Sequence, residues 1–451
     1  MQKGSLVTGP IQKSLILFAL PMMAGNLLQQ LYNVADTLIV GRFLGPDALA
    51  AVGSSYTLMT FLTSILLGLC MGSGAVFSLR YGQQDWKGLK EGIFHSFVLI
   101  AAVAAVLMGL AFGLLGGIIK LLQVPEGIVP LMRDYLWVIF WGIPAVFLYN
   151  YFAALLRAIG NSVVPLAFLG VSALLNIGLD LLFVITFQRG VAGAAEATVI
   201  SQYLSGIGIT CYTLWRVPEL RVRRHEMHWN GAALKEISNF SFLTCVQQSV
   251  MNFGILMVQG LINSFGPVIM AAFAAAVKID SFAYMPVQDF GNAFSTFVAQ
   301  NYGAGKTERI RKGMRGALMV AIVFCICISA VVCLFARPLM QIFVSPQETK
   351  IITAGVQYLW VEGLCYCGIG VLFLFYGFYR AMCKPAMSVV LTVISLGTRV
   401  VLAYSLSPHI GVIGIWIAVP IGWFLADAVG ALYYKGKMAA ILKSERENAA
   451  V

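Results

Sequence analysis

The chain has 451 residues, of which 59% are hydrophobic and only 11% charged, and its formal net charge is +11. A soluble protein carries roughly twice that share of charged residues, so the composition excludes a soluble globular domain. The positive charges form no basic, aromatic-bearing soluble segment, and we therefore expect no nucleic-acid partner.

Apolar blocks recur from end to end, and many of them have about the 20 residues that a helix needs to span a bilayer. We expect about twelve spans, centred near residues 25, 64, 105, 146, 175, 203, 250, 284, 329, 365, 396 and 423. No segment alternates in the way that the strands of a membrane barrel do. The predicted fold class is an all-α polytopic membrane protein.

The distribution of Lys and Arg residues predicts the orientation of the spans. With both chain ends inside, the inner segments hold 22 of the 30 Lys and Arg residues, the outer segments hold 6, and Lys278 and Arg399 lie within spans. Cytoplasmic loops are enriched in these residues. We expect a multi-pass protein of the cell inner membrane, embedded in the lipid bilayer, with both termini cytoplasmic.

A polar stripe follows one face of the first span and consists of Gln29, Tyr32, Asn33 and Asp36. The spacings i, i+3, i+4 and i+7 place these side chains on one side of a helix. Such a stripe faces the protein interior or a wet cavity rather than lipid. We expect the first three residues along the substrate pathway, and a hinge at Pro21, which favours a kink in the same span.

The fifth and sixth predicted spans carry further polar residues. Asn176 and Asp180 are four residues apart on one helical face, and Gln202 follows Thr198 by one turn. Carboxylate, amide and hydroxyl oxygens suit Na⁺, and carboxylates also suit a proton. We expect Asp36, Asn176, Asp180 and Thr198 to bind the cation and Gln202 to lie on the substrate pathway. The alternative is that Asn176 and Thr198 form helix–helix hydrogen bonds.

The two halves of the sequence repeat at an offset of 221 to 223 residues. The matches include Gly45-Pro with Gly266-Pro, Tyr135-Leu-Trp-Val with Tyr358-Leu-Trp-Val, and Gly190-Val-Ala-Gly with Gly411-Val-Ile-Gly. Each half holds six predicted spans, which gives two lobes related by a pseudo-two-fold axis, as in many secondary transporters. We expect lobes at residues 1–215 and 236–451, joined by a basic cytoplasmic linker at 216–235.

The repeat also shows that the polar positions of the first half are not kept in the second. Asp36 aligns with Met257, Asn176 with Arg399, Asp180 with Ala403, and Thr198 with Val419. An acid needed only to build a lobe should have an acidic twin in the other lobe. The predicted cation site therefore belongs to the first half alone.

The second half has its own charges within spans. Lys278 and Asp280 are two residues apart and do not face each other along a helix. We place Lys278, Tyr284 and Arg399 on the substrate pathway, with a structural ion pair as the alternative for both basic residues; Glu362 is one candidate partner of Arg399.

Four segments carry a resemblance to a known family: "DTLIVGRFLGPDALAAVG", "RAIGNSVVP", "GVAGAAEATVISQ" and "FSTFVAQNYGAGKTERIRKG". They resemble the multidrug and toxic compound extrusion (MATE) family, over essentially the whole chain. The resemblance implies a bacterial, twelve-helix, two-lobed antiporter that exports organic, often cationic, compounds in exchange for Na⁺ or H⁺.

The resemblance also implies which residues bind the cation. In many family members a first-helix Asp, an Asn and an Asp on helix five, and a Thr on helix six form the site; these match Asp36, Asn176, Asp180 and Thr198. Another branch has acidic residues on helices seven and ten. Here helix seven has Gln247 and Gln248, and helix ten has Glu362 near one end.

We therefore expect a secondary active multidrug antiporter that rocks between inward-open and outward-open states. We expect no enzymatic activity, no cofactor, no metal other than a possible Na⁺, small organic substrates and a functional monomer.

The alternative is a flippase for a lipid-linked saccharide precursor, whose cavity should be ringed by Arg and Lys to hold a pyrophosphate. An intramembrane enzyme would need a nucleophile with a base, or a metal cluster; a channel fits a two-lobe repeat with a one-sided ion site less well than gated exchange.

Overall fold

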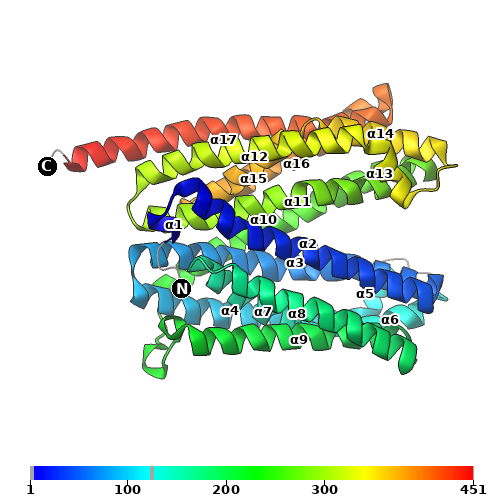
Figure 1. The fold of residues 1–451 in the computed structure, drawn as a ribbon, viewed down its shortest axis with the longest axis horizontal. Coiled ribbons are helices and arrows are strands. Elements are labelled where there is room, and N and C mark those ends of the chain that lie inside the picture. Colours follow the sequence, from blue (N-terminus) through cyan, green and yellow to red (C-terminus); the bar gives the residue numbers. More distant parts are fainter. Residues whose placement is uncertain (1–4, 122–125, 450–451) are drawn as a thin grey trace. The chain divides into compact units, whose positions relative to one another are not determined.

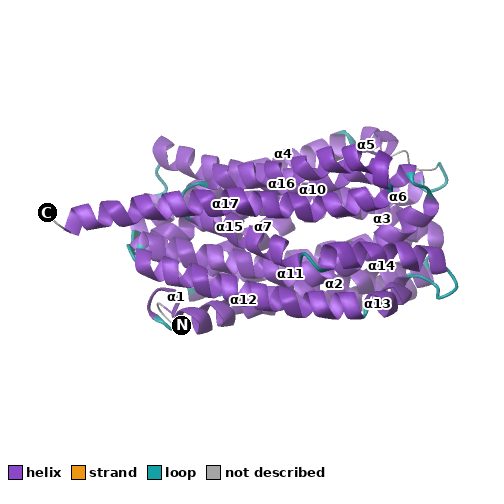
Figure 2. Cartoon of the chain, turned by 90° about the horizontal axis from the view of Figure 1, so that it is seen from above, coloured by secondary structure: helices purple, strands orange, loops and turns teal. Residues whose placement is uncertain are grey.

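The computed structural model describes residues 5–121 and 126–449. Nearly all of these residues are helical, and none of them forms a strand (Figure 2). Figure 1 shows the helices coloured along the chain. The all-helical fold class predicted from composition is confirmed.

The helices of the first half of the sequence are α1 (Ser5–Thr8), α2 (Ile11–Phe43), α3 (Pro46–Gln83), α4 (Trp86–Gly113), α5 (Leu115–Leu121), α6 (Val129–Ile139), η1 (Phe140–Gly142), α7 (Ile143–Ala158), α8 (Val163–Asp180), η2 (Leu181–Thr186) and α9 (Gly190–Arg216). Two short turns, η3 (Pro218–Leu220) and η4 (Arg224–Glu226), precede the second half. The helices of that half are α10 (Gly231–Ser264), α11 (Pro267–Gly303), α12 (Thr307–Leu334), α13 (Ala336–Phe343), α14 (Thr349–Gly363), α15 (Tyr366–Ala381), α16 (Pro385–Ile410) and α17 (Val412–Ala449).

The predicted spans correspond to these helices. All the predicted centres fall within helices except the one near residue 365, which lies at the short break between α14 and α15. Within the described residues, nine helical segments are long and apolar enough to cross a membrane, and α14 with α15 makes a tenth that is bent by 51°. Helices α9 and α10 are also long, but they are not among these segments.

Two tight turns illustrate how the repeated sequence builds repeated structure. Gly45 has φ 90° and ψ −178°, and its twin Gly266 has φ 91° and ψ 175°. Each glycine is followed by a proline in the first turn of the next long helix, where the missing N–H of proline has no helical partner to lose. Only glycine adopts this positive φ without strain. The Gly-Pro pairs therefore end one span and start the next in both halves.

One compact unit comprises residues 24–245. Its core includes Phe77, Phe140 and Tyr151, all at most 1% exposed. Within this unit α3 packs closely against α10, because a Cβ on Gly68 or Gly72 would lie 2.6 Å from the α10 backbone. The Ser73 and Ser241 hydroxyls are hydrogen-bonded at 2.8 Å beside this contact. Small residues at such crossings are typical of membrane helix packing.

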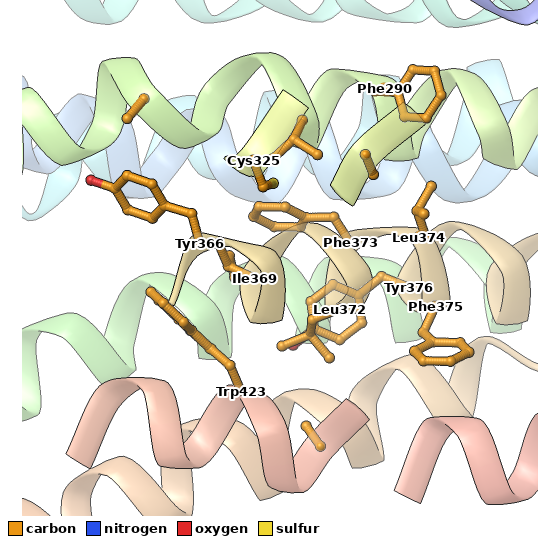
Figure 3. Close-up of a cluster of buried hydrophobic side chains, with 14 of the residues drawn as sticks. Phe290, Cys325, Tyr366, Ile369, Leu372, Phe373, Leu374, Phe375, Tyr376 and Trp423 are labelled. Carbon is orange, nitrogen blue, oxygen red and sulfur yellow. The ribbon is translucent and has the colours of Figure 1, made fainter. Parts of the chain in front are cut away.

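The second compact unit comprises residues 1–23 and 246–451. Figure 3 shows part of its core, in which the side chains of α15 pack against α11 and α17. The segment before α2 is held to this unit by its backbone: the Leu6 carbonyl accepts hydrogen bonds from Asn301 Nδ2 at 3.1 Å and from Arg309 Nε at 3.3 Å. Leu6 itself is 2% exposed.

These units differ in extent from the predicted lobes at two places. Residues 1–23 group with the second half, and the linker 216–235 groups with the first half together with residues up to 245. Helix α2 is continuous through Pro21 and passes from one unit into the other just after it. The predicted hinge at Pro21 thus lies close to the point where α2 changes units.

The predicted linker is docked on α4 by polar contacts. Glu226 forms an ion pair with Lys90 at 2.7 Å, and the backbone N–H of Asn230 donates to His95 Nε2 at 2.9 Å. The Asn230 side chain also donates to Glu91 at 3.1 Å. Lys90 and the neighbouring Arg223 backbone N–H both donate to the Glu226 carboxylate, and together they lower its pKa. The linker is therefore an ordered part of the first unit.

Candidate cation site

The polar stripe of α2 forms one wall of the candidate site. Asp36, Tyr32 and Asn33 are half-buried, and Gln29 is exposed. The Asn33 side chain donates a hydrogen bond to Gln30 Oε1 at 3.2 Å, and the Asn33 backbone carbonyl accepts one from the Thr37 hydroxyl at 2.7 Å. The Asn33 side-chain amide is thus hydrogen-bonded within α2, whereas Asp36 and Tyr32 interact with Asp180 on α8.

Helices α8 and α9 form the opposite wall, as the spacing of their polar residues predicts. Asp180 is 0% exposed, Asn176 1% and Thr198 8%. Asn176 Nδ2 donates to Thr198 Oγ1 at 3.3 Å, and Thr198 Oγ1 donates to the Ala194 carbonyl at 3.1 Å. Asp180 is the last residue of α8 before the π-helical turn η2. Such turns inside helices frequently occur at functional sites.

The structure brings the carboxyl groups of Asp36 and Asp180 within hydrogen-bonding reach of each other. Asp36 Oδ1, both oxygens of Asp180 and Asn176 Oδ1 are buried and receive no hydrogen bond within the described part of the chain. The Asn176 amide nitrogen is bonded to Thr198, so its buried oxygen is the part of the amide that has no partner in the described residues. These oxygens are all acceptors and have no donor among them.

These buried acceptor oxygens are stabilised by a positive charge bound between them. Two carboxylates that touch in an apolar medium repel each other strongly, because the low dielectric constant screens them little. A proton shared between them, or a monovalent cation bound by the oxygens, removes this repulsion. The amide oxygen of Asn176 adds a hard ligand of the kind that Na⁺ takes. The oxygens of the candidate site are thus of the kinds that suit either ion.

Tyr135 is a site residue that the sequence did not single out. Its side chain is 7% exposed and interacts electrostatically with Tyr32 and with both carboxyl groups. The signal was present in the repeat, because Tyr135 aligns with Tyr358. The other polar residues of the site differ between the two halves, whereas this tyrosine is present in both. That difference was the available indication that Tyr135 belongs to the site.

The remaining predicted residues lie in different places. The Gln202 amide oxygen packs against Gly142, where a Cβ would lie 2.6 Å from it. Lys278 is exposed, and its ammonium lies 6.0 Å from the ring centre of Phe343. Tyr284 and Arg399 belong to a separate polar cluster in the second unit. The assignment of these residues to a substrate pathway stays a prediction.

Ligand sets for a transition metal are not seen at the site. Among the described residues, no group of three or more His, Cys, Asp or Glu side chains is arranged to hold a metal ion. The site thus consists of two carboxyl groups with neutral oxygen and hydroxyl neighbours. Such a set suits a light monovalent ion that binds and leaves.

Fold and site together define a polytopic helical membrane protein made of two repeated halves, one of which buries a carboxyl pair suited to an exchangeable cation. The chain belongs to the MatE family, whose sequence model matches residues 21–182 and 241–405. This is a family of transporters, and the family predicted from the sequence is confirmed.

Individual relatives match over almost their whole length. "Probable multidrug resistance protein YpnP" of Bacillus subtilis is 29% identical over 96% of this chain and 97% of its own. "Probable multidrug resistance protein NorM" of Thermotoga maritima is 26% identical, over 97% and 95%. A crystal structure of MATE in complex with MaL6 covers 98% of this chain and all of its own, with a TM-score of 0.92 at 23% identity, which concerns the fold alone.

Proposed function

We propose that the protein is a secondary active exporter of small organic, often cationic, compounds, driven by entry of Na⁺ or H⁺ through the site of Asp36 and Asp180. The observation that carries this proposal is the contact between two carboxyl groups whose buried oxygens receive no hydrogen bond within the described residues. The names of the relatives support the substrate class. We place the protein in the inner membrane, with both termini cytoplasmic, working as a monomer.

The roles of the residues follow from their contacts. Asp36 and Asp180 exchange the ion, and Asn176 supplies a neutral ligand that Thr198 orients through its hydroxyl. Tyr135 and Tyr32 border the pair and limit access of water. Ion loading removes the repulsion between the carboxyl groups and lets α2 approach α8 more closely.

Coupling requires that this local change alters the preference between two global states. Asp36 lies on α2, the helix that passes between the two compact units after Pro21. A change in the position of α2 therefore acts on both units. An ion that binds one state better than the other shifts the equilibrium, and the exported compound responds to the same equilibrium.

The proposal is tested by efflux of a fluorescent cationic dye from energised cells at matched expression. Wild type is compared with Asp36→Asn and with Glu196→Gln, and a pH gradient or a Na⁺ gradient is imposed alone. Glu196 is the matched control, because it is an acid of the same unit already paired with Arg189 at 2.9 Å.

We expect wild type and Glu196→Gln to export dye under one of the two gradients, which identifies the ion, and Asp36→Asn to fall to background. Equal efflux by wild type and Asp36→Asn would show that the carboxyl pair does not couple. If wild type exports none of several dyes, the multidrug assignment fails, and a lipid-linked saccharide becomes the substrate to test.

A further inference from the structure

The second unit buries a carboxyl pair of its own. Asp280 on α11 is 4% exposed, and Glu362 at the end of α14 is 1% exposed. Tyr358, which is 2% exposed, donates a hydrogen bond to Asp280 Oδ2 at 3.4 Å. Asp280 and Glu362 also interact electrostatically with each other. This group, with Tyr366 and Arg399, is called the C-terminal cluster below.

The C-terminal cluster is enclosed by aromatic side chains. Trp416 is fully buried, stacks on Phe273 at 5.7 Å, and meets Tyr358 edge-on at 4.9 Å. Tyr366 extends from the apolar packing of α15, with its hydroxyl pointing away from the labelled aromatic and aliphatic side chains (Figure 3). That hydroxyl lies beside the Asp280 carboxyl. The two acids of this cluster are therefore buried among aromatic side chains.

Several polar atoms of the cluster are buried but have no hydrogen-bond partner in the described ranges. They are Asp280 Oδ1, Glu362 Oε1, the Tyr366 hydroxyl and Arg399 Nε. Tyr366 is 1% exposed, so its hydroxyl meets the acids inside the protein. The cluster thus buries two carboxyl groups and a guanidinium group with incomplete hydrogen bonding in the described residues.

Arg399 is the cation that faces both acids. It lies on α16, its Nε is buried, and it interacts electrostatically with Asp280 and with Glu362 without a direct ion pair to either acid in the described residues. In the repeat, Arg399 occupies the position of Asn176, and Tyr358 that of Tyr135. Equivalent positions of the two halves therefore both border a carboxyl pair, but one half has an amide where the other has a guanidinium.

The charge balance of the two pairs differs accordingly. Among the described residues, no cationic side chain is one of the groups that interact electrostatically with Asp36 and Asp180, so this pair needs a mobile cation or proton. The pair of Asp280 and Glu362 has a permanent positive charge nearby and two tyrosine hydroxyls that can disperse the remaining negative charge. Arginine stays protonated in proteins, so this positive charge does not leave.

We infer that Arg399 is the resident counter-cation of Asp280 and Glu362 and keeps the C-terminal half from binding an exchangeable cation. Arg399 thereby determines which half of the protein couples to the ion gradient. This inference rests on the proposed function, because it takes the Asp36 and Asp180 pair as the site of ion coupling. The residues to which it assigns a role all lie in the second unit. It predicts that a neutral residue at 399 opens a second cation site.

The test measures thermal unfolding of purified protein in detergent at alkaline pH, with Na⁺ or with choline at equal ionic strength. All variants carry Asp36→Asn, which removes the first site from the readout. We expect Arg399→Asn, the residue of the twin position, to gain a Na⁺-dependent rise in Tm of about 1 to 2 °C once Na⁺ exceeds its Kd roughly tenfold.

Two controls separate charge from structure. Arg399→Lys keeps the positive charge and should show no Na⁺-dependent rise. Adding Glu362→Gln to Arg399→Asn removes one carboxylate and should abolish the gain. If Arg399→Asn does not purify as folded protein, Arg399→Gln repeats the test with a longer neutral side chain.

The inference is overturned if neutral variants at 399 respond to Na⁺ no more than Asp36→Asn alone, or if Arg399→Lys gains the same response. Failure of the proposed function would be seen elsewhere, as unchanged dye efflux by Asp36→Asn. The two failures are therefore distinguishable.

Discussion

The two halves of this chain each bury a pair of carboxyl groups beside a tyrosine at the same repeat position, yet they neutralise the charge differently. In the first half, the carboxyl groups of Asp36 and Asp180 lie within hydrogen-bonding reach of each other, and Asp36 Oδ1 and both Asp180 oxygens have no donor within the described residues. In the second half, Asp280 accepts a hydrogen bond from Tyr358 and faces Arg399. The duplicated fold thus carries one carboxyl pair that needs a mobile ion and one carboxyl pair whose positive charge is supplied by an arginine side chain.

The difference shows that a few residue positions decide how each half of the repeat neutralises its carboxyl pair. Asn176 and Arg399 are twins in the sequence, and the same place in each half is an amide ligand in one and a permanent cation in the other. Elsewhere the two halves keep equivalent turns, as Gly45 before α3 and Gly266 before α11 show. The variants below break or sharpen this comparison.

The largest expected effect is a contrast in stability between the two pairs. Asp280→Asn leaves Arg399 with less compensating charge and should lower the free energy of unfolding by about 2 kcal/mol or more. Asp180→Asn removes repulsion between like charges and should leave stability unchanged or raise it. Thermal unfolding in detergent measures both, with the exposed Asp134→Asn as the control. Equal destabilisation by both substitutions would remove the distinction.

The next effect concerns the orientation of a proposed ligand. Thr198→Val removes the hydroxyl that accepts from Asn176 Nδ2, so the Asn176 amide is free to turn. We expect the concentration of the coupling ion needed for half-maximal efflux to rise roughly tenfold, the scale at which loss of an orienting partner weakens ion binding. The twin change Val419→Thr should leave this ion dependence as in wild type. A similar shift from Val419→Thr would contradict the one-sided site.

A smaller effect separates the twin tyrosines. Tyr358→Phe removes the hydrogen bond to Asp280 and should cost about 1 kcal/mol of stability without changing the ion dependence of efflux. Tyr135→Phe should change that ion dependence several-fold at little cost in stability, because its neighbours are the exchangeable pair. Unfolding and efflux are measured on both variants. The reverse pattern would assign the exchangeable ion to the second half.

The smallest effect lies outside both pairs, at the docked linker. Lys90 lowers the pKa of Glu226, so the contact stabilises the folded state above the ordinary carboxyl pKa and is lost as the pH falls through the folded-state value. Glu226→Gln should lower Tm slightly at neutral pH, and the difference from wild type should vanish in acid. A difference that persists in acid would mean that the ion pair is not its source.

Much of the fold was predictable because membrane spans are a local signal. The predicted centres match the helices, and the i, i+4 spacing of Asn176 and Asp180 correctly placed both on one buried face. The hydrogen bond between Asn176 and Thr198 is the helix–helix contact that the sequence offered as the alternative for these two residues, and their binding of a cation stays a prediction.

The rest depended on contacts between helices, which periodicity does not reveal. Asp280 and Glu362 lie on different helices, and only the packing of α11 with α14 brings them together. The grouping of residues 1–23 with the second half likewise depends on hydrogen bonds such as that of Asn301 to Leu6. The position of Lys278 over Phe343 was not apparent from its sequence neighbours.

The most direct test of the central claim is ion counterflow in liposomes that contain only the purified protein. Substrate is added on one side without a pre-set gradient, and ion movement is followed with a pH-sensitive dye and with ²²Na⁺, for wild type, Asp36→Asn and Arg399→Lys. The account predicts counterflow of one ion in wild type and Arg399→Lys and none in Asp36→Asn. Counterflow that survives in Asp36→Asn would contradict it.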